Sequence, residues 1–121
     1  MICVGIDVAK DKHDCFILSS EGEILADVFT IPNNAEGFDH LLQMIRNCSR
    51  PQDKIKVGLE ATEHYSYNIL GFLLDKGMPT HVINPLYTNL YRKSLSLRKT
   101  KTDRVDARTI ATCLLYTSRC V

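Results

Sequence analysis

The chain has 121 residues, of which 45% are apolar and 24% charged, a composition typical of one compact globular domain. No apolar stretch reaches the ~18–20 residues of a membrane-spanning helix. The N-terminal sequence MICVGIDVAK lacks the basic region and apolar run of a secretory signal peptide. We therefore expect a cytoplasmic protein without a membrane partner. Five cysteines with no CxxC pair and no zinc spacing argue against a disulfide framework or a zinc finger, and we expect Cys3 and Cys15 to be buried.

The formal net charge of +1 conceals an uneven distribution. Residues 1–84 contain 7 Lys/Arg and 12 Asp/Glu, whereas residues 85–121 contain 8 Lys/Arg and 2 Asp/Glu. A basic segment beside an acidic body suggests a polyanionic partner. On charge alone, the alternative of a solvated basic helix face stays open.

Three apolar stretches joined by short polar connections open the chain. Their patterns predict strands over 1–8, 13–19 and 24–31, with Gly22 in the second turn and Pro32 ending the third strand. Because short connections join antiparallel neighbours, we expect these strands to form a meander.

The rest of the chain alternates between helical and strand patterns. Asn33 stands three residues before Glu36, which predicts a capping-box start for an amphipathic helix over 35–47. The further elements that we expect are a strand over 55–60, a helix over 61–76 ended by Gly77, a strand over 80–83, a helix from Asn84 to about Leu97, and a last helix from Asp103. A meander followed by βαβ crossovers predicts an α/β fold with a mixed five-stranded sheet flanked by helices.

Four carboxylates occupy positions that suit a metal site. Asp7 lies within the first strand, where an unpaired buried charge is costly, and Glu60 ends the fourth strand. Asp103 and Asp106 are three residues apart on the last helix and share a face. Singly, each has a structural explanation, such as a solvated strand end or a helix start. Together they suit Mg²⁺ or Mn²⁺ and a two-metal phosphodiester displacement, so we predict all four as metal ligands and catalytic residues.

Lysine and arginine side chains are concentrated near the acidic pair. Such side chains neutralise phosphates irrespective of base sequence. Tyr87 and Tyr91 share a helix face beside them, and either stack on bases or pack at the core edge. The predicted nucleic-acid contacts are Arg92, Arg98, Lys99, Lys101, Arg104 and Arg108.

The motifs GIDVAKDKHDCFIL, VGLEATEHYS, HVINPLYTNLYR and RKTKTDRVDARTIA follow one another from about residue 3 to residue 111. Together they resemble the N-terminal DEDD domain of the IS110 family of transposases, which is related to the Piv invertases and similar in fold to the Holliday-junction resolvase RuvC. The resemblance implies an RNase H-like catalytic domain over 1–112. It also implies metal-dependent DNA strand cleavage and exchange by the four acidic residues, and it adds Lys10 of the first motif to the nucleic-acid-binding candidates.

The resemblance carries expectations about partners as well. The family has a second domain with a nucleophilic serine, which is missing from this chain, so we expect the chain to be inactive alone. A structured guide RNA and a second copy of the chain are further candidate partners. Glu63 stands where the family commonly has Gly, a departure beside Glu60. The tail over 113–121 departs from the family pattern, and we expect it to be a truncated continuation of the domain.

Two other classes of function stay open. An ATPase similar to actin and the sugar kinases also begins with an Asp-bearing strand, but no Gly-rich phosphate loop follows Asp7. The second is a non-catalytic fragment that binds nucleic acid or self-associates. Thermal stabilisation by ATP would favour the ATPase. Mn²⁺ binding that is unchanged in Asp7→Asn and Asp106→Asn would favour the non-catalytic fragment.

Overall fold

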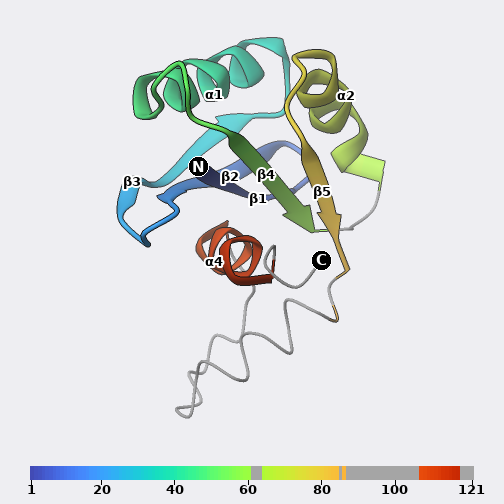
Figure 1. The fold of residues 1–121 in the computed structure, drawn as a ribbon. Helices are drawn as coiled ribbons and strands as arrows, with labels where there is room; N and C mark the ends of the chain where they lie inside the picture. Colours follow the sequence, from blue (N-terminus) through green and yellow to red (C-terminus); the bar gives the residue numbers. More distant parts are fainter. Residues whose placement is uncertain (61–63, 85, 87–106, 118–121) are drawn as a thin grey trace.

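The computed structural model describes residues 1–60, 64–84, 86 and 107–117. Within them, five strands form one mixed sheet in the order β3-β2-β1-β4-β5 (Figure 1). The strands are β1 (Ile2–Asp7), β2 (Lys12–Ser19), β3 (Ile24–Pro32), β4 (Ile55–Glu60) and β5 (Thr80–Ile83). The helices are α1 (Ala35–Cys48), the short 3₁₀ helix η1 (His64–Ser66), α2 (Tyr67–Asp75) and α4 (Ala107–Thr117). The predicted α/β class and the mixed five-stranded sheet are confirmed.

Strand pairing explains how the sheet is both parallel and antiparallel. β1 pairs antiparallel with β2, and β2 pairs antiparallel with β3, which confirms the meander. β1 pairs parallel with β4, and β4 pairs parallel with β5, because α1 and then α2 carry the chain back between them. The central strand β1 therefore has a neighbour of each kind.

Helices cover both faces of the sheet (Figure 1). On one face, alternate residues of β1 and β4 pack with α1 and α2 in a large apolar cluster that includes Ile6, Leu59, Leu41 and Ile69. On the other face, a smaller cluster joins the sheet to α4, and its buried members are Cys3, Phe16, Leu18, Ala107, Ala111, Leu114 and Leu115. Successive strand residues point to opposite faces, so the position of Gly5 and Asp7 follows from that of Cys3: all three belong to the α4 face.

The start of α1 differs from the prediction. The N-cap is Asn34, whose Oδ1 accepts the backbone N–H of Gly37 at 2.9 Å, so Asn33 was the wrong choice of capping residue. The error is one position, and both residues are asparagines. Asn33 is used instead to hold the connection between β1 and β2, as described below.

Two predicted glycine positions are confirmed, because Gly22 and Gly77 have φ of 88° and 74°, in the left-handed region that suits glycine. Asn84 Oδ1 accepts the backbone N–H of Leu86 at 2.9 Å, which is the bond expected of an N-cap. The helix predicted after Asn84 lies almost entirely outside the described residues. The start of the predicted last helix at Asp103 also lies outside them.

Helix α4 approaches the sheet closely because a glycine lies beneath it. A Cβ atom on Gly5 would collide with the carbonyl oxygen of Ala107 and would lie 2.5 Å from the backbone nitrogen of Ala111. The neighbouring residue in the register, Gly58, faces the flexible end of Leu114, at 3.2 Å. The glycine pair, Gly5 and Gly58, thus lets the backbone of α4 lie directly on β1.

The domain boundary predicted after residue 112 falls within α4, and Cys113, Leu114 and Leu115 are buried with the residues before them. The boundary itself stays a prediction. Among the described helices, none has the length and apolar character needed to cross a membrane. Cys3 and Cys15 are buried and unoxidised, as expected.

Candidate functional site

Asp7 and Glu60 lie side by side at the carboxyl ends of two parallel strands. The register pairs Ile6 with Leu59, so Asp7 and Glu60 occupy the next position on β1 and β4. Adjacent strands are ~4.8 Å apart, and side chains at one register position share a face. Both side chains are half-buried and belong to the α4 face. The structure therefore brings together the two predicted metal ligands that it describes.

A third carboxylate, which the sequence analysis did not select, occupies the same row. Asp14 of β2 pairs with Asp7 in the antiparallel register and lies on the same face as Phe16. Its Oδ1 accepts a hydrogen bond from the hydroxyl of Thr30, at 2.7 Å. Acidic side chains on three adjacent strands repel one another, so this edge of the sheet favours a cation. The alternation of β2 about Phe16 was the available signal for Asp14.

The other two predicted ligands, Asp103 and Asp106, lie outside the described residues. Among the residues that the structure does describe, no group of three or more His, Cys, Asp or Glu side chains is arranged to hold a metal ion. Two half-buried carboxylates on adjacent parallel strands are nevertheless a suitable part of an oxygen-ligand set for Mg²⁺ or Mn²⁺. The donor chemistry fits such an ion, and the full set of ligands stays a prediction.

The connection that follows Asp7, loop 8–11, carries the exposed Lys10 and is tied down at three backbone groups. Ala9 donates its N–H to Nδ1 of the fully buried His13, at 3.2 Å. The amide nitrogen of Asn33 donates to the carbonyl oxygen of Lys10, at 2.9 Å, and the backbone N–H of Asn33 donates to the carbonyl oxygen of Asp11, at 2.9 Å. The conformation of loop 8–11 therefore depends on residues of β2 and of the β3–α1 connection.

Burial determines the protonation of His13. Loss of solvation lowers its pKa below the ordinary value, and Asn33 and the charge of Asp14 oppose that shift without cancelling it. The neutral ring accepts at Nδ1, so its proton lies on Nε2. Nε2 of His13 and Oδ1 of Asn33 are both buried, and neither atom has a formed hydrogen bond among the described residues. The ring stacks on Phe38 of α1, with centroids 6.3 Å apart.

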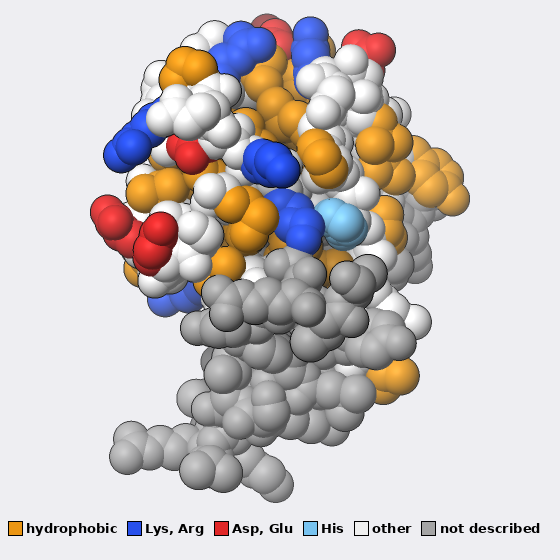
Figure 2. Space-filling view, viewed as in Figure 1, with side chains coloured by type: hydrophobic (Ala, Val, Ile, Leu, Met, Phe, Trp, Pro, Cys, Tyr) orange, Lys and Arg blue, Asp and Glu red, His pale blue; other side chains and the backbone are white. Residues whose placement is uncertain are grey.

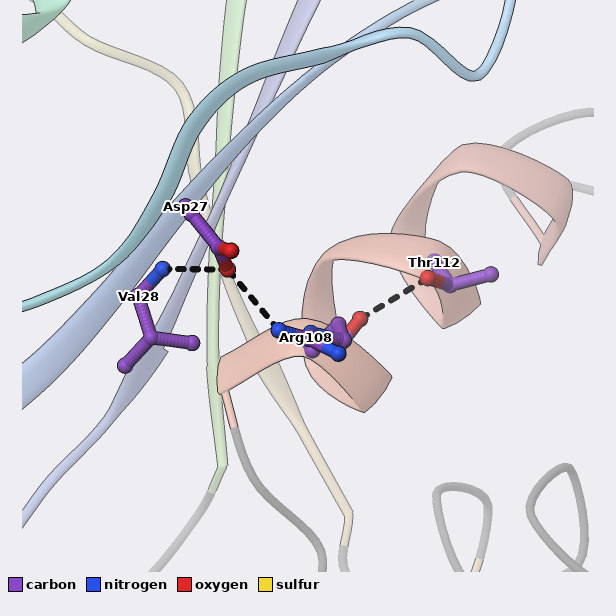
Figure 3. Close-up of polar contacts among 4 residues, drawn as sticks. All are labelled: Asp27, Val28, Arg108 and Thr112. Atoms are coloured by element: carbon purple, nitrogen blue, oxygen red, sulfur yellow. Dashed lines mark hydrogen bonds and ion pairs between the residues drawn. The ribbon is translucent and has the colours of Figure 1, made fainter.

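Arg108, at the start of α4, is the other described member of the predicted nucleic-acid contacts. Its guanidinium donates to Asp27 of β3 at 2.8 Å (Figure 3). The same guanidinium lies 5.5 Å above the ring centre of Phe16. The backbone N–H of Val28 and then Arg108 lower the pKa of the exposed Asp27. In this structure Arg108 joins α4 to the edge strand of the sheet, and its contact with nucleic acid stays a prediction.

The remaining predicted contacts lie outside the described residues; they are Arg92, Arg98, Lys99, Lys101 and Arg104. In the view of Figure 2, basic side chains of the described part are scattered among acidic and apolar ones. Most of the basic segment of the sequence lies outside the described residues.

A pocket of about 300 Å³ lies at the opposite end of the sheet, among residues that include Met1, Ser19 and Asp53. None of the predicted site residues lines it. The candidate site is therefore the carboxyl edge of β1 and β4 and not this pocket.

Comparison with solved structures defines the fold. The chain is similar to Thermus thermophilus RuvC, with a TM-score of 0.67 and 14% identity over 99% of this chain and 96% of that one. It is also similar to the fowlpox virus Holliday junction resolvase, with a TM-score of 0.51 and 16% identity over the whole of both chains. At such identities the likeness is one of fold, and the fold is the RNase H-like fold of RuvC.

Sequence comparison then gives the family. A family model described as a transposase, that of the IS110 DEDD type, matches residues 4–120. The chain is 33% identical over 105 residues to the pilin gene-inverting proteins of Moraxella lacunata and Moraxella bovis. The chain belongs to the DEDD family of IS110 transposases. It spans 31% of the length of these relatives and the match covers 86% of the chain.

Proposed function

We propose that this chain forms the metal-binding half of a DNA transposase or recombinase, with Asp7, Glu60, Asp103 and Asp106 as the ligands of Mg²⁺ or Mn²⁺ and as the catalytic residues. The observation that carries the proposal is the shared register position of Asp7 and Glu60 on adjacent parallel strands. Membership of a transposase family and the RuvC fold support DNA cleavage of the nuclease type.

The close packing of α4 supports the participation of the acidic pair. Ala107, the first residue of α4, lies over Gly5, and Asp7 lies two residues further along β1 on the same face. Asp106 directly precedes Ala107 in the sequence. This covalent tether favours a site shared by β1, β4 and the residues before α4.

The residues of the site have separate roles in this proposal. The carboxylates hold the divalent ion, which when bound supplies Lewis-acid stabilisation of the phosphodiester oxygens. Lys10, Arg92, Arg98, Lys99, Lys101, Arg104 and Arg108 are proposed to neutralise DNA phosphates. The apolar clusters on both faces of the sheet fix the direction of β1 and β4, and with it the spacing of Asp7 and Glu60.

The partners are part of the same proposal. A further domain with a nucleophilic serine, a structured guide RNA and a second copy of the chain would complete the machinery, which would act in the cytoplasm. We also propose that the catalytic domain covers residues 1–112 and that the tail over 113–121 is a truncated continuation of it. The relatives, of which the chain spans 31%, are long enough to contain such a domain.

Metal-dependent stabilisation tests the site. We expect Mn²⁺ to raise the unfolding temperature of the chain, since a ligand at 100 times its Kd stabilises by about 2.7 kcal/mol. Asp7→Asn and Glu60→Gln should each remove most of that shift, because each deletes a charged ligand. The measurement is thermal unfolding in Mn²⁺ and in EDTA.

Asp39→Asn is the matched control. Asp39 is an exposed carboxylate of α1, on the opposite face of the sheet, and its loss should leave the Mn²⁺ shift unchanged. Equal Mn²⁺ shifts in wild type, Asp7→Asn and Glu60→Gln would contradict the proposed site. Lost Mn²⁺ stabilisation with retained DNA affinity would separate metal binding from nucleic-acid binding.

A further inference from the structure

Hydrogen bonds from His13 and Asn33 hold loop 8–11, and the proposed function gives neither residue a role. His13 is fully buried, although histidine carries two polar nitrogens. Its Nδ1 accepts a hydrogen bond from the backbone N–H of Ala9. Asn33 uses its amide and its own backbone N–H on Lys10 and Asp11. Two polar side chains from different elements therefore converge on one short surface loop.

Among the residues that the structure describes, few other contacts hold loop 8–11. Its residues Ala9, Lys10 and Asp11 are exposed, and only Val8 is buried in the apolar cluster beneath α1. Each backbone residue that is ordered loses about 1–2 kcal/mol of conformational entropy. The three hydrogen bonds made by His13 and Asn33 therefore account for an ordered loop at this place.

The loop begins one residue after Asp7, and Lys10 is three residues beyond it. Three residues span at most ~11 Å, so Lys10 stays near the carboxyl edge of β1. A lysine ammonium is a compact charge on a flexible stem, and it recognises a phosphate through charge more than through shape. An ordered backbone beneath it lowers the entropy lost when the phosphate binds.

We propose that His13 and Asn33 are positioning residues, which hold loop 8–11 so that Lys10 meets a DNA phosphate beside Asp7. The proposal rests on the proposed function, since it takes DNA as the ligand of this edge. His13 fixes the start of the loop through Ala9, and Asn33 fixes its middle through the carbonyl groups of Lys10 and Asp11. Neither side chain contacts the DNA.

A double-mutant cycle on DNA affinity tests the proposal. The probe is a fluorescein-labelled 30-base-pair duplex, and its Kd is measured by anisotropy in EDTA at several salt concentrations. Lys10→Ala should weaken binding about three- to tenfold and reduce the slope of log Kd against log salt by about one phosphate contact. Asn33→Ala should weaken binding in wild type but cause no further loss in the Lys10→Ala background.

Two variants separate positioning from stability. Asn34→Ala removes the adjacent asparagine, which caps α1 and does not touch the loop, so it should lower stability and leave DNA affinity unchanged. His13→Leu removes both ring nitrogens: Nδ1, which accepts the N–H of the exposed Ala9, and the buried Nε2, which has no formed hydrogen bond among the described residues. It places an apolar side chain against Phe38. It should fold as well as wild type and still weaken DNA binding as Asn33→Ala does.

The outcomes distinguish this inference from the proposed function. Wild-type protein that shows no salt-dependent DNA binding would contradict the DNA-binding part of the proposed function. If wild type binds but Lys10→Ala matches it, or if Asn33→Ala costs the same affinity with and without Lys10, the positioning role is wrong. Full DNA affinity in His13→Leu would overturn it as well.

Discussion

His13 illustrates how one buried polar side chain links stability to pH. The ring is neutral in the folded chain because burial lowers its pKa below the ordinary 6.5, against the opposing effects of Asn33 and Asp14. In the unfolded chain the same ring takes up a proton below pH 6.5. Folding therefore excludes a proton that the unfolded state binds, so stability rises with pH across this range.

The free energy of unfolding should accordingly fall as the pH is lowered from 7.5 to 5.5. The contribution of His13 is complete above pH 6.5 and is lost as the pH falls towards its folded pKa. Urea unfolding at the two pH values measures the difference, and His13→Leu should show a smaller one. The exposed His40 provides the control, since His40→Gln should keep the wild-type difference. An unchanged difference in His13→Leu would show that another group is responsible.

At the scale of the elements, the packing of α4 on the sheet makes a prediction about Gly5 and Gly58, and Gly71 of α2 serves as a comparison. Gly5→Ala should destabilise the fold by about 1–3 kcal/mol, because the added methyl meets the backbone of α4 and cannot be accommodated by a rotamer change. Gly58→Ala should cost less, since it meets the flexible ends of Leu114 and Ile83. Gly71→Ala, in the interior of α2 with open space around it, should stabilise by about 0.5–1 kcal/mol.

Urea unfolding midpoints of the three variants provide the measurement. The order expected is Gly71→Ala above wild type, then Gly58→Ala, then Gly5→Ala. A Gly5→Ala variant as stable as wild type would mean that α4 shifts on the sheet without cost. Far-UV circular dichroism provides the check that each variant retains its helices and strands.

The sequence was sufficient for the strands and for the order of the elements that the structure describes. Strand limits agree within one or two residues, because period-2 alternation and Gly or Pro at the ends leave little freedom. The N-cap of α1 was assigned to Asn33 instead of Asn34, since two adjacent asparagines offer the same chemistry to the helix. The two residues differ because Asn33 hydrogen-bonds to loop 8–11, which leaves Asn34 to cap the helix.

The candidate site was predictable in part. Strand ends indicated Asp7 and Glu60, but their shared register position depends on pairing between residues more than 50 positions apart, which no local pattern contains. Asp14 was missed because a single acidic residue in a half-buried strand is unremarkable until its neighbour on β1 is known. The three-residue spacing on a predicted helix indicated Asp103 and Asp106, and both stay predictions because they lie outside the described residues.

At the scale of the whole molecule, the chain spans 31% of the length of its relatives. We expect the 121-residue chain to bind Mn²⁺ and DNA but to join no DNA strands, because the proposed serine nucleophile would reside in a further domain. Incubation of the chain with a labelled recombination substrate, followed by denaturing electrophoresis, measures joined products. Recombinant product from the chain alone would contradict this division of roles.

The contact between Gly5 and Ala107 also has a consequence for protein synthesis. In the described part of the chain, α4 covers one face of β1, and α4 is synthesised about a hundred residues after β1. Until then α4 does not yet pack on the face of β1 that contains Cys3, Gly5 and Asp7. The proposed metal site, which combines Asp7 with the acidic pair before α4, would therefore form only after most of this domain has been synthesised. Translation itself would delay the assembly of that proposed site.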